Sequence, residues 1–133
     1  MHKGSCLCGA ISFEVACDLP PPDGCHCSLC RKHSGHYFAS TDVPRTALTI
    51  MGEQNIAWYR SSEKVRRGFC RVCGSSLFGG TWPEGPEVSV RLGSLDGDPG
   101  IRPQYRSFVA SKAVWDEIPD DGLERYDGPP PRP

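Results

Sequence analysis

The spacing of the eight cysteines constrains this 133-residue chain more than any other feature. Seven of them fall into three tight groups, which read Cys6-x-Cys8, Cys25-x-Cys27-x2-Cys30 and Cys70-x2-Cys73. Cysteines separated by one or two residues direct their sulfurs to one side of a short turn, the pattern of metal ligands. A disulfide framework would need an oxidising compartment, and the N-terminus shows no apolar secretory segment. The spacing therefore predicts a cytoplasmic zinc protein.

The first and third groups together predict a closed structural site. Cys6, Cys8, Cys70 and Cys73 supply four thiolates, which is the tetrahedral shell of a structural zinc. Such a site would tie the first strand to the middle of the chain. The alternative for Cys70 and Cys73 is dithiol redox chemistry, but the βαβ context of a thioredoxin-type motif is absent from this sequence.

The second group supplies three thiolates on one short segment. Three protein ligands and an open position are typical of a catalytic zinc, where water or an incoming thiol completes the shell. The alternative is a second closed site with a fourth ligand from elsewhere in the chain. His26 is expected to point away from the metal, and Cys17 to lie in the core. The candidates for a fourth ligand are Cys17, His26, His33 and His36.

Short strands and turns dominate the rest of the sequence, which contains 13 Pro and 15 Gly. Apolar alternation and β-branched residues predict strands at 11–17, 36–40, 46–50, 56–59, 65–69, 77–78, 88–92 and 105–109. Little helix is expected: one turn at 29–32 and a short helix from 111 toward 121. We predict a mainly β domain over 1–127 and a Pro-rich disordered tail at 128–133. The three tryptophans Trp58, Trp82 and Trp115 are expected to pack in the core, the alternative being a pocket lining.

Charge and hydropathy exclude several partner classes. The formal net charge is -1, from 15 basic and 16 acidic residues, so no broad electropositive field is available for nucleic acid. No apolar run approaches the roughly 20 residues that a membrane helix needs. The sequence predicts no nucleic-acid partner and no membrane segment, and it does not indicate an oligomeric state.

The order of the cysteine motifs resembles the glutathione-dependent formaldehyde-activating enzyme family, which includes centromere protein V-like proteins. The matching stretches are 4–9, 25–32 and 69–75, followed by Gly-Ser-Leu-Asp at 93–96 and the segment 109–115. The resemblance runs from about Gly4 to Tyr126. It implies a β-tent fold of short antiparallel strands pinned by zinc knuckles, with a structural zinc on Cys6, Cys8, Cys70 and Cys73. It also implies a functional zinc on Cys25, Cys27 and Cys30.

The resemblance further implies a carbon–sulfur lyase, similar to S-(hydroxymethyl)glutathione synthase, that adds a glutathione thiolate to formaldehyde or another small aldehyde. Arg31, Lys32 and His33 follow the three-cysteine group and are candidates to contact glutathione, the alternative being a solvated basic turn. Arg106 stands at or near a position where similar proteins often carry His. Two other functions stay open, a non-catalytic thiol carrier and a zinc-stabilised protein-interaction module.

Overall fold

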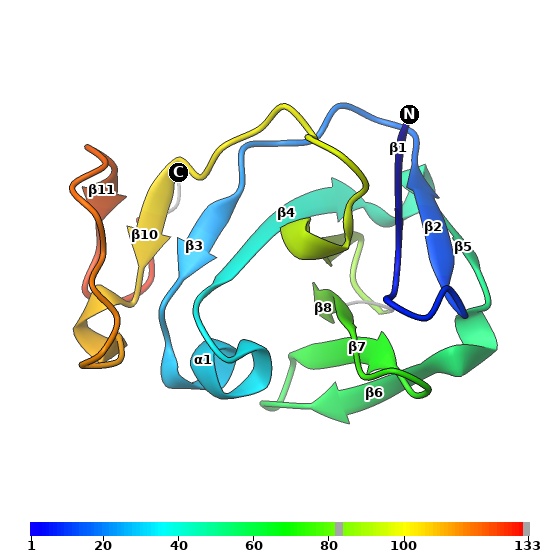
Figure 1. Ribbon diagram of the computed structural model, residues 1–133, viewed down its shortest axis with the longest axis horizontal. Helices are drawn as coiled ribbons and strands as arrows, with labels where there is room; N and C mark the ends of the chain where they lie inside the picture. Colours follow the sequence, from blue (N-terminus) through cyan, green and yellow to red (C-terminus); the bar gives the residue numbers. More distant parts are fainter. Residues whose placement is uncertain (82–83, 132–133) are drawn as a thin grey trace. The chain divides into compact units, whose positions relative to one another are not determined.

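The computed structural model describes residues 1–81 and 84–131 and divides the chain into two compact units. The first unit comprises Met1–Pro20 and Thr41–Ile101, and the second comprises Pro21–Ser40 and Arg102–Pro133. The described residues form eleven strands and a single α-helix, so the prediction of a mainly β fold with little helix is confirmed (Figure 1). One continuous domain over 1–127 stays a prediction.

The first unit contains a three-stranded antiparallel sheet and a four-stranded antiparallel series. The small sheet has the order β1-β2-β5, which lie side by side in Figure 1, and pairs Gly4 with Phe13 and Phe13 with Ile50. The series has the order β9-β8-β7-β6. The bounds are β1 (His2–Ser5), β2 (Ser12–Val15), β5 (Leu48–Met51), β6 (Ile56–Arg60), β7 (Arg66–Cys70), β8 (Ser76–Gly80) and β9 (Glu87–Arg91), with 3-10 turns at Arg45–Ala47, Glu53–Asn55 and Leu92–Ser94.

The core of this unit is built from the inward side chains of these strands. The rings of Phe13 and Phe78 meet edge to face, with centroids 5.2 Å apart, and both side chains are fully buried. Burying one such side chain contributes roughly 1.5–3 kcal/mol to folding. Other buried members are Ile11, Val15, Val43, Ile56, Leu77, Val88 and Val90. Cys17 and Trp58 are partly buried and pack against this cluster, as expected for both residues.

The second unit is a small mixed sheet with one helix. Its strand order is β11-β10-β3-β4, in which β10 runs parallel to both β3 and β11 while β3 and β4 are antiparallel. The helix α1 follows β3 directly and ends at Gly35, whose φ of 89° is left-handed. The bounds are β3 (Asp23–Cys25), α1 (Ser28–Ser34), β4 (Phe38–Pro44), β10 (Tyr105–Ser107) and β11 (Glu124–Arg125), with a 3-10 turn at Val109–Ser111; β4 continues into the first unit from Thr41.

Two expectations for the segment after β10 are wrong. No α-helix forms between residues 111 and 121; only the 3-10 turn Val109–Ser111 is present. Pro119 cannot continue a helix, and the buried Asp116 side chain is held by hydrogen bonds to two histidines. Trp115 is 60% exposed and lies outside the core. Trp82 falls outside the described residues.

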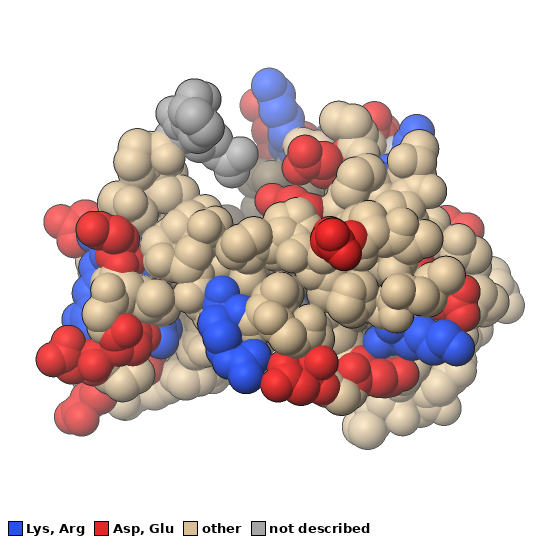
Figure 2. All heavy atoms as spheres, turned by 90° about the horizontal axis from the view of Figure 1, so that it is seen from above, with Lys and Arg blue, Asp and Glu red and all other residues tan. Residues whose placement is uncertain are grey.

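The remaining expectations concern the chain's end, its surface and the membrane. In the segment predicted as a tail, the Gly128 carbonyl accepts a hydrogen bond from the Phe108 amide, while residues 132–133 lie outside the described part. Basic and acidic side chains are scattered over the mostly uncharged face drawn in Figure 2, without a broad basic area. Within residues 1–81 and 84–131, no helix is long and apolar enough to cross a bilayer.

Candidate metal centres

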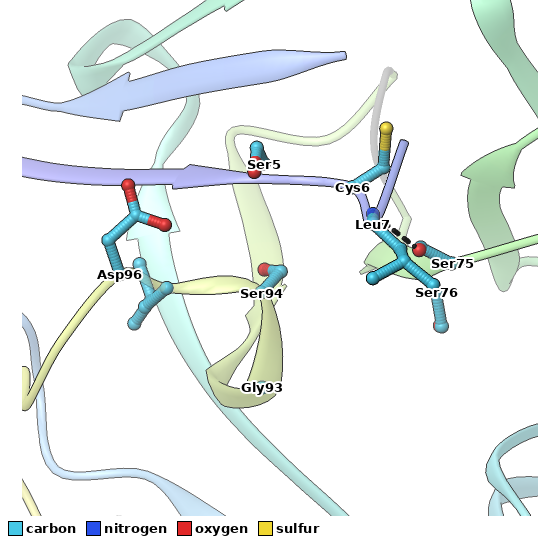
Figure 3. Close-up of a pocket in the computed structure, with 9 residues that line it drawn as sticks. Ser5, Cys6, Leu7, Ser75, Ser76, Gly93, Ser94 and Asp96 are labelled. Atoms are coloured by element: carbon cyan, nitrogen blue, oxygen red, sulfur yellow. Dashed lines mark hydrogen bonds between the residues drawn. The ribbon is translucent and has the colours of Figure 1, made fainter. Parts of the chain in front are cut away.

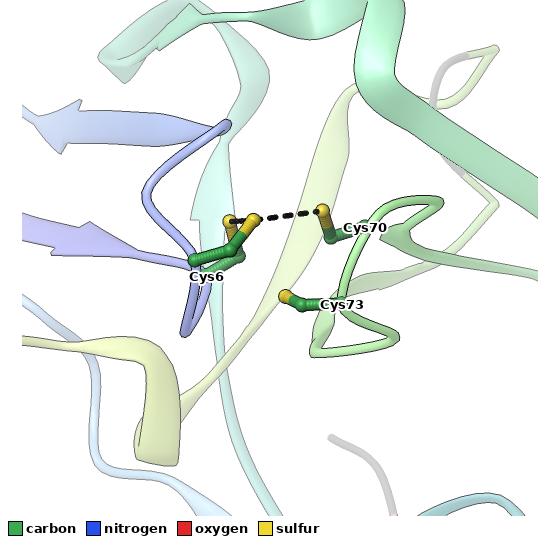
Figure 4. A group of neighbouring side chains, drawn as sticks. Cys6, Cys70 and Cys73 are labelled. Atoms are coloured by element: carbon green, nitrogen blue, oxygen red, sulfur yellow. Dashed lines mark hydrogen bonds between the residues drawn. The ribbon is translucent and has the colours of Figure 1, made fainter.

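The first cysteine cluster joins two turns of the first unit that are far apart in sequence. Cys6 and Cys8 lie in the turn between β1 and β2, and Cys70 ends β7, three residues before Cys73. Gly9 and Gly74 follow the two pairs with φ values of 80° and 82°, which a residue with a Cβ would adopt only with strain. In Figure 4 the sulfurs face one another across the gap between the two turns.

The spacing of these sulfurs fits a tetrahedral metal. The Cys6 and Cys8 sulfurs are 3.6 Å apart, and those of Cys8 and Cys70 are 3.8 Å apart. A tetrahedron with metal–sulfur bonds of about 2.3 Å places its sulfurs about 3.8 Å from one another. All four ligand atoms lie within 4.8 Å of each other. The structure thus brings together the four cysteines predicted to share one zinc.

Hydrogen-bond donors surround this cluster but do not favour the thiolate equally at its members. Against a hydrogen bond from the Ala10 backbone, burial and the neighbouring thiols raise the pKa of Cys8 to about 11. The backbone amide of Ile11 donates to the Cys6 sulfur at 3.3 Å, and that of Val72 donates to Cys70 at 3.4 Å. Hydrogen bonds from the Ser75 hydroxyl and backbone lower the pKa of Cys73 to about 5. Donors of this kind offset the negative charge of a four-thiolate shell.

A polar cavity of about 350 Å³ opens beside the first cluster. Figure 3 shows that hydroxyl groups line it, and Ser75 accepts a hydrogen bond from the Leu7 amide at 2.9 Å. The other lining groups include Ser5, Ser94 and Asp96. Sequence reasoning did not identify this cavity, since its serines come from three segments that are far apart in the sequence.

The second cluster is formed by one continuous segment of the second unit. Cys25 ends β3, Cys27 caps the N-terminus of α1, and Cys30 is buried in the first turn of that helix. The Cys27 sulfur accepts a hydrogen bond from the Cys30 amide at 3.3 Å. Their three sulfurs lie within 4.8 Å of one another. Hydrogen bonding to Cys30 and burial both raise the pKa of Cys25.

The described part of the chain places no fourth protein ligand at this cluster. Among the described residues, no additional His, Cys, Asp or Glu brings a ligand atom within the same distance of all three sulfurs. Both ring nitrogens of His26 are engaged elsewhere: Nδ1 lies 3.3 Å from Asp116 and Nε2 lies 3.2 Å from Arg106. His36 also pairs with Asp116, at 3.0 Å. The arrangement therefore leaves a tetrahedral ion one free position at this cluster.

The basic residues after the cluster differ in their surroundings. Lys32 is exposed, whereas Arg31 and His33 are half-buried in the last turns of α1. The His33 ring lies 5.9 Å from that of Phe38. The Nε atom of Arg31 is buried and has no hydrogen-bond partner among the described residues. A buried donor of this kind is costly unless an acceptor reaches it.

Arg106 is a structural part of the second unit. Its side chain is 8% exposed, and its guanidinium donates to Asp121 at 2.7 Å and 3.0 Å. It also lies 5.1 Å from the centre of the Tyr37 ring, within cation–π range. The hydrogen bonds from Arg106 hold the pKa of Asp121 below its usual value. Sequence reasoning singled out Arg106 but did not find its partners, which are 15 and 80 residues away.

Comparisons with known proteins point to one enzyme family. Residues 1–111 match the family model described as glutathione-dependent formaldehyde-activating enzyme. A provisionally named glutathione-dependent formaldehyde-activating enzyme of Halomonas elongata is 34% identical over 127 residues, which cover 87% of this chain and 80% of the relative. An uncharacterized lyase of Schizosaccharomyces pombe is 30% identical over 77 residues, covering 58% of this chain and 56% of that protein.

A solved structure shares the fold. The crystal structure of a Rhodobacter sphaeroides protein superposes with a TM-score of 0.60 at 27% sequence identity, covering 76% of this chain and 97% of that one. The match of the family model extends over well more than half of the sequence. The chain belongs to the glutathione-dependent formaldehyde-activating enzyme family and is an enzyme of the carbon–sulfur lyase type.

Proposed function

We propose that this protein adds the thiolate of glutathione to formaldehyde, or to a related small aldehyde, at the Cys25–Cys30 cluster. The observation that carries the proposal is three converging sulfurs without a fourth protein ligand among the described residues. The four-cysteine cluster would hold a structural zinc, and the three-cysteine cluster a second zinc. Family membership supports glutathione and formaldehyde as the substrates.

The chemistry of the donors supports zinc at both clusters. Thiolates are preferred ligands of zinc, and the four-sulfur set matches its tetrahedral geometry. A zinc ion bound to Cys25, Cys27 and Cys30 would lower the pKa of a thiol in the open position, so that a thiolate exists at neutral pH. In the addition itself, the carbon–sulfur bond forms while the carbonyl π bond breaks, and the oxygen then takes a proton to give the hydroxymethyl thioether.

Residues of α1 would bind the charged ends of glutathione. The buried Arg31 Nε lacks an acceptor among the described residues, and a substrate carboxylate would supply one. Lys32 lies exposed on the next position of the same helix, and His33 completes the basic turn. Arg31→Lys would keep the charge but lose the planar fork of donors. We therefore expect it to raise the KM for glutathione more than it lowers kcat.

Magnetisation-exchange NMR tests the proposal directly. In a mixture of glutathione and formaldehyde, the protein should accelerate exchange between free glutathione and its hydroxymethyl adduct. Cys27→Ser should abolish the acceleration, whereas Cys17→Ser is a matched control that removes a thiol belonging to neither cluster. An exchange rate that the wild-type protein leaves unchanged, despite a measurable affinity for glutathione, would instead identify a non-catalytic thiol carrier.

A further inference from the structure

His26 lies inside the three-cysteine motif and is enclosed by Arg106 and Asp116, which come from the C-terminal segment of the second unit. The His26 side chain is 1% exposed, although it stands between two candidate metal ligands. Its Nδ1 lies 3.3 Å from Asp116 Oδ2, and its Nε2 lies 3.2 Å from Arg106 Nη1. The Tyr37 ring stacks on the imidazole at 5.0 Å between centroids.

The chemistry of these partners determines which ring nitrogen carries the proton. A guanidinium has donors only, so Nε2 of His26 must accept the hydrogen bond from Arg106. Nδ1 then carries the hydrogen and donates to the Asp116 carboxylate. With an acceptor on one side and a donor on the other, the neutral ring is held in a single tautomer and orientation. Neither nitrogen is left to bind a metal.

The backbone of His26 and of the preceding Cys25 is held as well. Its amide donates to the Ser107 carbonyl at 2.9 Å, and Cys25 pairs with Ser107 where β3 lies parallel to β10. Consecutive Cα atoms are only 3.8 Å apart, so fixing His26 limits where Cys25 and Cys27 can lie. In a well-formed metal site, each metal–ligand distance lies within about 0.2 Å of its ideal value. Small movements of this residue would therefore disturb the geometry of the three sulfurs.

We propose that His26 is a positioning residue for the Cys25 and Cys27 sulfurs and that Asp116 is its anchor. Asp116 is 8% exposed and also accepts from His36 Nε2 through its other oxygen, at 3.0 Å. The His36 bond uses Oδ1 and so leaves Oδ2 to accept the hydrogen bond from His26. The inference rests on metal binding at the second cluster and is independent of the proposed reaction.

Metal affinity measured separately at the two clusters tests this role. Loss of an outer-shell partner typically weakens metal binding about 10–100-fold. We expect His26→Ala and Asp116→Ala each to weaken zinc binding at the second cluster by about this factor, as measured by chelator competition. Binding at the four-cysteine cluster in the other unit should not change. If the two residues act as one clamp, the double variant should lose little more than either single variant.

Conservative and matched variants separate positioning from general destabilisation. His26→Asn places an amide N–H where Nδ1 lies and should recover part of the affinity. His36→Ala removes only the hydrogen bond to the other oxygen of Asp116. The affinity of the second cluster for zinc should then stay within about threefold of wild type, as is usual for substitutions at exposed positions. Asp120→Asn is the matched control, because Asp120 is exposed and lies four residues from Asp116.

Cadmium NMR provides a measurement that general destabilisation of the fold would not change at one cluster alone. A four-sulfur and a three-sulfur site give separate resonances, and only the latter should shift or broaden in His26→Ala. Wild-type affinity at the second cluster in both His26→Ala and Asp116→Ala would overturn the inference and leave the proposed function intact. A wild-type protein that binds a single metal ion would contradict both.

Discussion

Replacing Cys70 by serine should unfold the first unit or deprive it of its metal. The Cys70 side chain is fully buried at the end of β7, and its sulfur lies 3.8 Å from that of Cys8. Structural zinc contributes roughly 10–16 kcal/mol of apparent binding free energy at neutral pH. A domain's total free energy of unfolding is about 5–15 kcal/mol. Losing even half of the metal's contribution would therefore remove most of the stability.

Thermal unfolding monitored by circular dichroism, together with metal content by mass spectrometry, checks this prediction. The wild-type protein should hold two zinc ions per chain and lose much of its thermal stability when a strong chelator is added. Cys70→Ser should resemble the chelated protein. Cys17→Ser, which changes a partly buried cysteine outside both clusters, should stay close to wild type. A Cys70→Ser protein with two bound metals and the wild-type melting temperature would refute the reasoning.

Two further perturbations test the core and the second unit. Phe78→Ala leaves the fully buried Phe13 without its ring partner and should cost about 3–5 kcal/mol in urea denaturation, whereas truncating the exposed Val72 to alanine should change the free energy of unfolding by less than about 0.5 kcal/mol. Arg106 lowers the pKa of Asp121 in the folded protein. Their ion pair therefore stabilises the fold fully above the unfolded carboxyl pKa of about 3.9. This stabilisation is lost as the pH falls through the lower pKa that Asp121 has in the folded state. Asp121→Asn should therefore be less stable than wild type at pH 7 and nearly equal to it at about pH 2; an equal deficit at both values would contradict the assigned pair.

Local patterns in the sequence identified much of the β structure. The alternation of Ile11, Phe13 and Val15 predicted β2, and the structure buries all three side chains. Strands without such a pattern were missed. Gly4 lies in β1 and Gly24 in β3, and glycine has a poor intrinsic preference for strands. Their pairing depends on neighbours such as β10, more than 80 residues beyond β3, which no local window contains.

The cysteine clusters were predictable because ligand spacing is itself local. Each group of cysteines lies on one short segment. The only decision that local spacing did not settle was that the first group shares its metal with the third. The surroundings of the second cluster were not predictable in the same way. His26 was expected to point away from the metal, but its partners Asp116 and Arg106 are 90 and 80 residues distant. The segment containing Asp116 was itself predicted to be helical.

The two clusters differ in what supports their sulfurs. At the first cluster, Cys6 and Cys70 belong to turns that are far apart in the sequence, so a shared metal would close a loop of more than 60 residues. Without the ligands of one turn, the other turn would no longer be held in place. At the second, Cys25 and Cys30 belong to one short segment, so a metal there closes almost no loop. The entropy that a metal must overcome at this cluster is small only if the segment is already ordered, and the hydrogen bonds of His26 supply that order. An open metal site on a short segment therefore needs residues other than its ligands, such as His26, to hold the segment in place. In the closed four-cysteine site the ligands themselves hold the two turns together.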